Sequence, residues 1–172
     1  MHIRREIASD VAAVHDVHRA AFGSDEEVDP VEVGLLARLR DDDAWLPRLS
    51  LVATAGDRVV GHVTCTRAVV GPERHALLGL GPLGVAPAVQ GRGVGSALMH
   101  AVLGAAEACD EPLVGLLGAP AYYRRFGFVR STDRAIGPPD AGWGDAFQVR
   151  TLTAHTPDIR GPFRYARPFE EL

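Results

Sequence analysis

The sequence predicts a mixed α/β domain, and three observations lead to this prediction. The chain has 172 residues, 47% of them apolar, which suits one domain with a sizeable core. Segments with a helical spacing of apolar residues alternate with β-rich runs. Near the middle, an apolar run that Pro87 interrupts is followed by a glycine-rich loop and by a helical pattern over residues 96–108. We therefore expect residues 1–172 to form a single domain of class α/β (α+β).

The N-terminal segment is predicted to contain one strand and two helices. Residues 3–7 are typical of a strand, and Ser9 or Asp10 is suited to cap the helix that follows. Asp29 and Pro30 then mark the start of a second helix, as an N-cap residue and a proline at the first helical position.

The remainder of the chain is predicted to be richer in strands. Residues 49–54 and 58–70 flank a hairpin turn, and a strand over residues 113–117 follows the long helix. A short helix begins near Pro120 and ends at Gly127, a suitable C-terminal glycine. After it we expect, in order, a long loop over residues 130–146, a strand over 147–152, and an irregular tail in which Phe163, Tyr165 and Phe169 pack back onto the body.

The glycine-rich loop predicts a binding site for a phosphate group. Residues 90–95 read Gln-Gly-Arg-Gly-Val-Gly and stand between the predicted strand and the predicted helix. The first N–H groups of a helix have no partner within the helix, and the helix dipole leaves partial positive charge there. Glycines let a phosphate approach those N–H groups closely, and Arg92 adds a permanent charge.

Two other phosphate-binding motifs do not fit this part of the chain. A P-loop requires Gly-Lys followed by Ser or Thr, which the run lacks. Residues 79–84 match G-x-G-x-x-G, but Pro82 removes an N–H group from it, and Val-Ala-Pro follows where a helix should begin. Glu111 precedes a strand instead of ending one, which is the wrong place for a ribose contact.

Residues 90–95 match the motif Q/R-x-x-G-x-G/A, and the chain here resembles the coenzyme A loop of the GNAT superfamily of N-acetyltransferases. Residues 121–128, Ala-Tyr-Tyr-Arg-Arg-Phe-Gly-Phe, resemble the following Y-x-x-x-G-F element of that superfamily. The resemblance covers residues from about 77 to 130. It implies a mixed, mostly antiparallel sheet of six to seven strands with helices on both faces.

The resemblance also implies an activity. The chain would transfer an acetyl group from acetyl-CoA, its co-substrate, to a primary amine of a small-molecule or peptide acceptor, directly and within a ternary complex. The alternative is a non-catalytic module that binds acyl-CoA and regulates another protein. A homodimer is an open expectation that no feature of the chain demonstrates.

The match to the family motifs implies a role for several residues of this sequence. The main chain of Leu83, Gly84 and Val85 would bind the pantetheine arm, and the N–H of Val85 would face the thioester carbonyl, where negative charge develops. The pyrophosphate would be held by the loop and the start of the helix, through Gln90, Gly91, Arg92, Gly93, Val94, Gly95 and Ser96.

A tyrosine commonly protonates the thiolate leaving group in this superfamily. Counting back from Gly127 assigns this role to Tyr123, with Tyr122 as the alternative. A third alternative is that neither is essential, because thiolates leave readily without help. An asparagine that many relatives use to bind the pantetheine arm is missing from residues 117–120, so that contact is in doubt.

The base that deprotonates the acceptor amine is not identified by the sequence. The candidates are Asp25, Glu26, Glu27 and Glu73, although each is typical of a solvated surface acid, and water can serve instead. The acidic loop around Glu26 weakly favours a cationic acceptor.

Composition excludes several other classes. A net charge of −4 without a basic run argues against nucleic-acid binding, and no stretch is long enough to cross a membrane. Cys65 and Cys109 are too few for a disulfide framework, which favours the cytoplasm, and Cys65 is predicted to be a small buried residue. His15 and His18 share a helix face without a cysteine or carboxylate at ligand spacing, so we predict no metal site.

Overall fold

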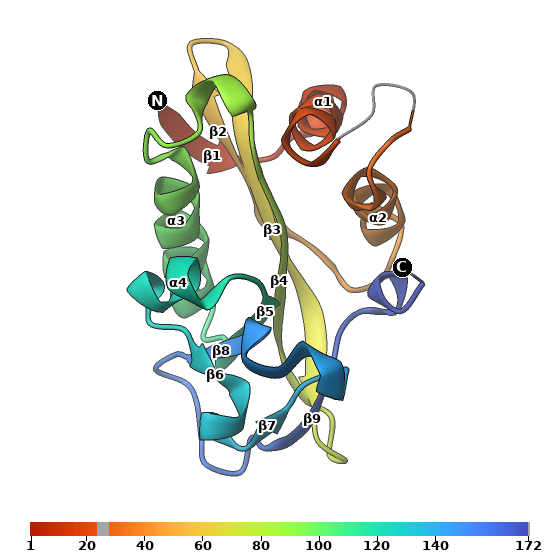
Figure 1. Cartoon of the computed structure of the whole chain (residues 1–172), viewed down its shortest axis with the longest axis vertical. Coiled ribbons are helices and arrows are strands. Elements are labelled where there is room, and N and C mark those ends of the chain that lie inside the picture. Colours follow the sequence, from red (N-terminus) through yellow and green to blue (C-terminus); the bar gives the residue numbers. More distant parts are fainter. Residues whose placement is uncertain (24–27, 172) are drawn as a thin grey trace.

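The computed structural model describes residues 1–23 and 28–171. A long twisted sheet runs through the molecule, and helices cover it on both sides (Figure 1). The helices are α1 (Val11–Phe22), α2 (Val31–Arg40), α3 (Val94–Ala108) and the short α4 (Pro120–Tyr123). The strands are β1 (His2–Arg5), β2 (Trp45–Ala55), β3 (Arg58–Val70), β4 (His75–Val85), β5 (Leu113–Leu117), β6 (Val129–Arg130), β7 (Ile136–Gly137), β8 (Phe147–Thr151) and β9 (Gly161–Arg164).

The sheet is mixed and mostly antiparallel, as expected. In the described part of the chain its strands follow the order β1-β2-β3-β4-β5-β8-β6, while β9 pairs with β3 and with the short β7. The pair β4–β5 is parallel, as is β7–β9, and the other pairs are antiparallel. The main path therefore agrees with the predicted six to seven strands, and β7 and β9 are additions from the segments expected to be loop and tail.

Two helical layers enclose the sheet. Helix α3 and α4 lie on one face, and α1 and α2 lie on the other (Figure 1). Buried Leu98, Met99 and Val102 of α3 pack against the sheet in the largest apolar cluster. On the opposite face, Val14 of α1 and Leu36 of α2 are buried together. Burial of these apolar side chains, at roughly 25 cal/mol per Å² of apolar surface, is what holds the layers together.

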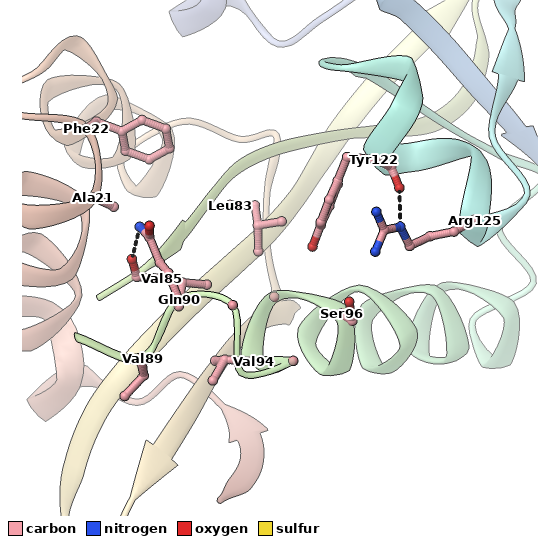
Figure 2. A pocket seen from close by; sticks show the side chains of 13 residues that line it. Ala21, Phe22, Leu83, Val85, Val89, Gln90, Val94, Ser96, Tyr122 and Arg125 are labelled. Atoms are coloured by element: carbon pink, nitrogen blue, oxygen red, sulfur yellow. Dashed lines mark hydrogen bonds between the residues drawn. The ribbon is translucent and has the colours of Figure 1, made fainter. Parts of the chain in front are cut away.

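The strands β4 and β5 separate after a short parallel contact. They pair through Leu78↔Val114 and Gly79↔Gly115, and β4 then continues to Val85 with its edge on the β5 side unpaired within the described residues. The helix α4 follows β5 and lies across this gap from the end of β4 (Figure 2). The fold thus leaves main-chain groups of β4 free beside the glycine loop.

Two predicted helix caps differ from the structure. Asp10 stands at the N-cap position of α1, but its side chain pairs with Arg4 and accepts the N–H of Ile7 instead of capping the helix. Helix α2 begins at Val31 with Pro30 as the N-cap residue, because Asp29 is engaged with His15 of α1 at 3.4 Å. In both cases an ion pair with another element takes the carboxylate away from the helix end.

The C-terminal tail packs back onto the body, as predicted. Phe163 is 1% exposed and its ring lies 5.0 Å from that of Phe147. Tyr165 and Phe169 continue this aromatic cluster, with ring centroids 4.5 Å apart. Within residues 1–23 and 28–171, no helix has the length and apolar character required to span a bilayer.

Candidate active site

A cavity of about 440 Å³ lies where β4, the glycine loop, the start of α3 and α4 meet (Figure 2). Four segments contribute its walls. They are the end of α1 (Ala21, Phe22), the end of β4 (Leu83, Val85), the loop and start of α3 (Val89, Gln90, Gly91, Gly93, Val94, Gly95, Ser96), and the α4 region (Tyr122, Arg125). The structure therefore brings most of the residues predicted for the coenzyme A site into one place.

The glycine loop has the geometry of an anion site. Gly91 and Gly93 adopt positive φ angles of 73° and 84°, which residues with a Cβ rarely adopt. Gly93 is the N-cap residue of α3, and its carbonyl accepts the first intrahelical bond, from Ala97 at 2.9 Å. The N–H groups at the beginning of this 15-residue helix are therefore directed at the loop, where the helix dipole favours negative charge. Arg92 is exposed and is not among the residues of the cavity wall.

The end of β4 presents alternate main-chain groups to the open edge. Ala86 donates its N–H to the carbonyl of Val60 on β3, at 2.9 Å. Because hydrogen bonding alternates along an antiparallel pair, the main-chain groups of Gly84 face β3, and those of Leu83 and Val85 face the open side. The carbonyl of Val85 accepts a bond from Gln90 Nε2 at 2.9 Å, which leaves its N–H directed at the gap.

The two tyrosines occupy different environments. Tyr122 lines the cavity, and a Cβ added at Gly95 would lie 2.8 Å from its hydroxyl, so the hydroxyl rests against the start of α3 (Figure 2). Tyr123 is not part of that wall. Its ring lies against Gly118 and meets the ring of Phe128 edge-on at 6.0 Å, and burial raises its pKa to about 12. The structure thus places Tyr122, the alternative, in the cavity wall, whereas Tyr123, half-buried like Tyr122, packs toward Gly118 and Phe128.

Arg125 is a site residue that the sequence did not indicate. Its Nε donates to the carbonyl of Tyr122 at 2.9 Å, and its guanidinium lies over the Tyr122 ring, 4.9 Å from the centroid. These contacts hold a positive charge in the cavity wall. The signal in the sequence was the pair Arg124-Arg125 directly after the tyrosines, which is indistinguishable from an ordinary exposed basic pair.

Of the predicted acidic candidates for the base, the structure describes Glu73. Asp25, Glu26 and Glu27 lie outside the described residues. Glu73 lies at the opposite end of β4 from the loop, where it pairs with His75 at 3.2 Å. Among residues 1–23 and 28–171, no group of three or more His, Cys, Asp or Glu side chains is arranged to hold a metal ion.

Other polar residues considered from the sequence have structural roles. Glu111 is 5% exposed and binds Arg67 through two bonds of 2.6 and 2.8 Å, so its carboxylate is used inside the fold. Cys65 is fully buried in the core, as predicted, and burial raises the pKa of its thiol. Neither group is available to a ligand.

A strand edge, a helix N-terminus and a cavity between them form a site suited to an extended ligand that carries phosphate. Comparison with known proteins identifies the family. Residues 2–130 match the family described as "Acetyltransferase (GNAT) domain". The uncharacterized N-acetyltransferase YjhQ of Escherichia coli K12 is 33% identical, over 94% of this chain and 90% of YjhQ.

Solved structures agree with this match. The GNAT-family N-acetyltransferase YhbS of Escherichia coli, in complex with CoA, is 30% identical with a TM-score of 0.88, covering 98% of this chain and 91% of YhbS. A GNAT-family acetyltransferase of Brucella melitensis, in complex with acetyl-CoA, is 32% identical with a TM-score of 0.78, covering 98% of this chain and 97% of that one. The chain belongs to the GNAT family of acetyltransferases, and is therefore an acyltransferase of the predicted class.

Proposed function

We propose that this protein transfers the acetyl group of acetyl-CoA to a primary amine of a small-molecule or peptide acceptor, by direct attack within a ternary complex. The observation that carries the proposal is the open edge of β4 ending beside an anion-binding loop. The complexes of the two similar enzymes with CoA and acetyl-CoA support the same ligand here.

The cofactor would lie along three features in succession. Its pyrophosphate would accept bonds from the N–H groups of residues 93–96, with Arg125 beside it. Its pantetheine arm would pair with the main-chain groups of Leu83 and with the N–H of Val85, whose carbonyl is bonded to Gln90. Gly84 would contribute by its lack of a side chain, since its main-chain groups are used in the ladder to β3.

Chemistry would take place at the end of the pantetheine arm. The amine nitrogen attacks the thioester carbon, and the N–H of Val85 would stabilise the negative charge that develops on the carbonyl oxygen. The nitrogen loses its proton to water, the C–S bond breaks, and the thiolate takes a proton from a tyrosine hydroxyl, which is protonated at neutral pH. Since Tyr122 lines the cavity and Tyr123 does not, we assign this role to Tyr122. Solvent then returns a proton to the tyrosine.

The test is a transfer assay with four amines: spermidine, tyramine, a peptide with an internal lysine and a peptide with a free N-terminal alanine. Thiol release and the mass of the product are measured with acetyl-CoA. The proposal expects an acetylated product from at least one amine. Binding of acetyl-CoA without transfer to any of these amines, or to a wider amine panel, would instead support the non-catalytic module.

A further inference from the structure

We propose that Phe22 of α1 selects the acceptor, and that the acceptor is a primary amine whose carbon chain carries an aromatic ring. This inference rests on the proposed acetyl transfer and names the class of amine that the same site would take. The ring of the acceptor would pack on the ring of Phe22 while its amine reaches the thioester.

Phe22 presents an aromatic ring to the cavity. It is the last residue of α1, and its side chain is 39% exposed. It forms the cavity wall together with Leu83 and Val85, whose main-chain groups face the open edge of β4. A ligand that covers this ring removes apolar surface from water, which favours binding. The exposed ring therefore adjoins the strand segment where the thioester would lie.

A buried histidine supports the ring from inside the fold. The Phe22 ring stacks on the imidazole of His18, with centroids 5.7 Å apart and an angle of 12° between the planes. His18 is fully buried, and its imidazole lies against β4, where a Cβ added at Gly84 would be 2.9 Å away. Because Phe22 and Gly84 both contact this imidazole, the Phe22 ring lies close to the segment that would bind the pantetheine arm.

A buried chain of hydrogen bonds keeps His18 in place. Its Nε2 lies 2.9 Å from Nδ1 of His62 on β3. Nε2 of His62 lies 2.9 Å from Oγ of Ser50 on β2 and 3.3 Å from Oε2 of Glu6. Arg40 of α2 donates to the other carboxylate oxygen of Glu6 at 2.6 Å. The imidazole under the aromatic ring is therefore anchored to two strands and to a second helix.

The cavity has an apolar side and a charged side. Phe22 comes from α1, Tyr122 and Arg125 come from the α4 region, and Leu83 lies between them in the view of Figure 2. Among the described residues of the wall, Arg125 is the one charged side chain and no carboxylate is present. A second cationic group on the acceptor would lose hydration here without gaining a partner of opposite charge. The wall thus favours an acceptor that is uncharged apart from the reacting amine.

An aromatic ring on the acceptor complements Phe22 better than an aliphatic group does. Two aromatic rings attract each other in offset-stacked or edge-to-face arrangements, beyond the effect of the surface that they bury. Because the Phe22 ring adjoins Leu83 and Val85, a short carbon chain would join a ring packed on Phe22 to an amine at the thioester. Tyramine and 2-phenylethylamine are amines of this form.

A cationic acceptor is the competing occupant. The acidic loop around Glu26 favours such an acceptor, but this loop lies outside the described residues. An ammonium group would also be attracted to the face of the Phe22 ring. Spermidine represents this class, and 2-phenylethylamine represents the aromatic class, so the two amines distinguish the occupants.

The kinetic test compares kcat/KM for these two amines in native protein, Phe22→Ala and Val11→Ala. Val11 is the matched control, because it is 40% exposed on the same helix and lies outside the cavity wall. We expect native protein to prefer 2-phenylethylamine at least tenfold, and Phe22→Ala to reduce this preference about tenfold through a higher KM for the aromatic amine. The control should retain the preference. A preference for spermidine, or an unchanged preference in Phe22→Ala, would overturn the inference.

The affinity for acetyl-CoA separates a contact with the acceptor from a contact with the cofactor. We expect the Kd of Phe22→Ala for acetyl-CoA, measured by calorimetry, to stay within about threefold of native. A loss confined to acetyl-CoA affinity, with the preference between the two amines unchanged, would assign Phe22 to the cofactor and contradict the proposal.

Two further variants separate the aromatic ring from apolar bulk. Phe22→Tyr retains a ring, whereas Phe22→Leu retains an apolar side chain without one. We expect native protein and Phe22→Tyr to prefer 2-phenylethylamine over 2-cyclohexylethylamine about threefold, and Phe22→Leu to lose this preference. Burial of apolar surface alone would favour the cyclohexyl amine. Equal kcat/KM for these two amines in native protein would overturn the choice of an aromatic acceptor.

A binding measurement needs no turnover. Phenylalanine ring signals are recorded by NMR on protein saturated with CoA, which carries no acetyl group, while 2-phenylethylamine is added. We expect the signals of Phe22, identified by their absence in Phe22→Leu, to shift, and those of the buried Phe147, outside the cavity wall, to stay unchanged. Unshifted Phe22 signals would overturn the inference even if another amine is acetylated. If CoA does not bind at all, it is the proposed function that fails, so the two failures are distinct.

Discussion

The two faces of β4 near Gly84 differ in how the chain builds them. On the α3 side, the proposed anion-binding loop consists of consecutive residues, 90–96, in which the glycines lead directly into the start of α3. On the α1 side, a buried chain of hydrogen bonds joins residues far apart: His18 and His62 are separated by 44 positions, and Glu6 and Arg40 by 34. A site made from one local segment can be predicted from the sequence, whereas a site made by pairing distant strands and helices cannot.

The largest effect is expected from removing the hydroxyl of the tyrosine that protonates the thiolate, which we assign to the cavity-facing Tyr122. We expect Tyr122→Phe to lower kcat about 100-fold, because the thiolate loses its proton donor, whereas Tyr123→Phe should lower kcat no more than about threefold. Steady-state rates at saturating acetyl-CoA measure the difference. The reverse ranking would restore Tyr123 as the acid.

The buried histidines should make stability depend on pH. The unfolded chain protonates each imidazole below its ordinary pKa of 6.5, while the folded chain holds that of His18 at about 3. The contribution of His18 is complete above pH 6.5 and is lost as the pH falls toward 3, by up to about 1.4 kcal/mol per pH unit. Burial also lowers the pKa of His62, so its contribution is lost in the same direction. Below 4.5, protonation of Glu6 in the unfolded chain adds to the loss, since its folded pKa is about 2.

Urea unfolding at pH 7, 6 and 5 measures this slope. His18→Gln should reduce it by one histidine's share. An equal slope in native protein and variant would show that His18 is not held neutral by the fold.

Two glycine-to-alanine variants, one on each side, compare the α1 and α3 faces of β4 directly. The Cβ of Gly84→Ala would lie 2.9 Å from the buried ring of His18, on the α1 side, and should lower the melting temperature with little change in acetyl-CoA affinity. The Cβ of Gly95→Ala would lie 2.8 Å from the Tyr122 hydroxyl, on the cofactor side, and should weaken acetyl-CoA binding as well. Calorimetry measures the acetyl-CoA affinity of both variants, and steady-state rates measure their kcat. If both quantities changed equally in the two variants, the distinction between the two faces would be lost.

The smallest expected effect concerns Arg92. This side chain is exposed, so its charge is screened by solvent, and we expect Arg92→Ala to weaken acetyl-CoA binding only about threefold. The loss should shrink at 0.5 M salt. A loss of more than about thirtyfold would mean that Arg92 closes onto the phosphates when the cofactor binds.

The same comparison explains what could be predicted from the sequence. The order of elements, the loop over residues 90–95 and the end of the short helix at Gly127 depend on neighbouring residues, and the structure has each of them. The direction of each tyrosine could not be predicted. Tyr122 and Tyr123 are adjacent on one short helix, and only the packing of α4 against Phe128 and α3 decides which one lines the cavity.

The buried network was also beyond the sequence, although its residues were visible there. His18 was noted only as a neighbour of His15 on a helix, and the register of β2 with β3 brings Ser50 beside His62. Glu6 immediately follows β1, where its side chain is indistinguishable from a surface acid in the sequence. Only the assembled sheet with α1 and α2 upon it shows that these groups form one chain.

The central claim is that the glycine loop and the edge of β4 bind acetyl-CoA, and calorimetric titration tests it most directly. The titration compares native protein with Gly93→Glu, which places a carboxylate at the anion site on a residue with φ of 84°. Gly56→Glu is the matched control, since Gly56 has φ of 60°, open space around it and no place in the cavity wall. We predict micromolar binding to native protein and control, and a loss of at least 100-fold in Gly93→Glu. Equal affinity in all three proteins, or no binding to native protein, would contradict the account.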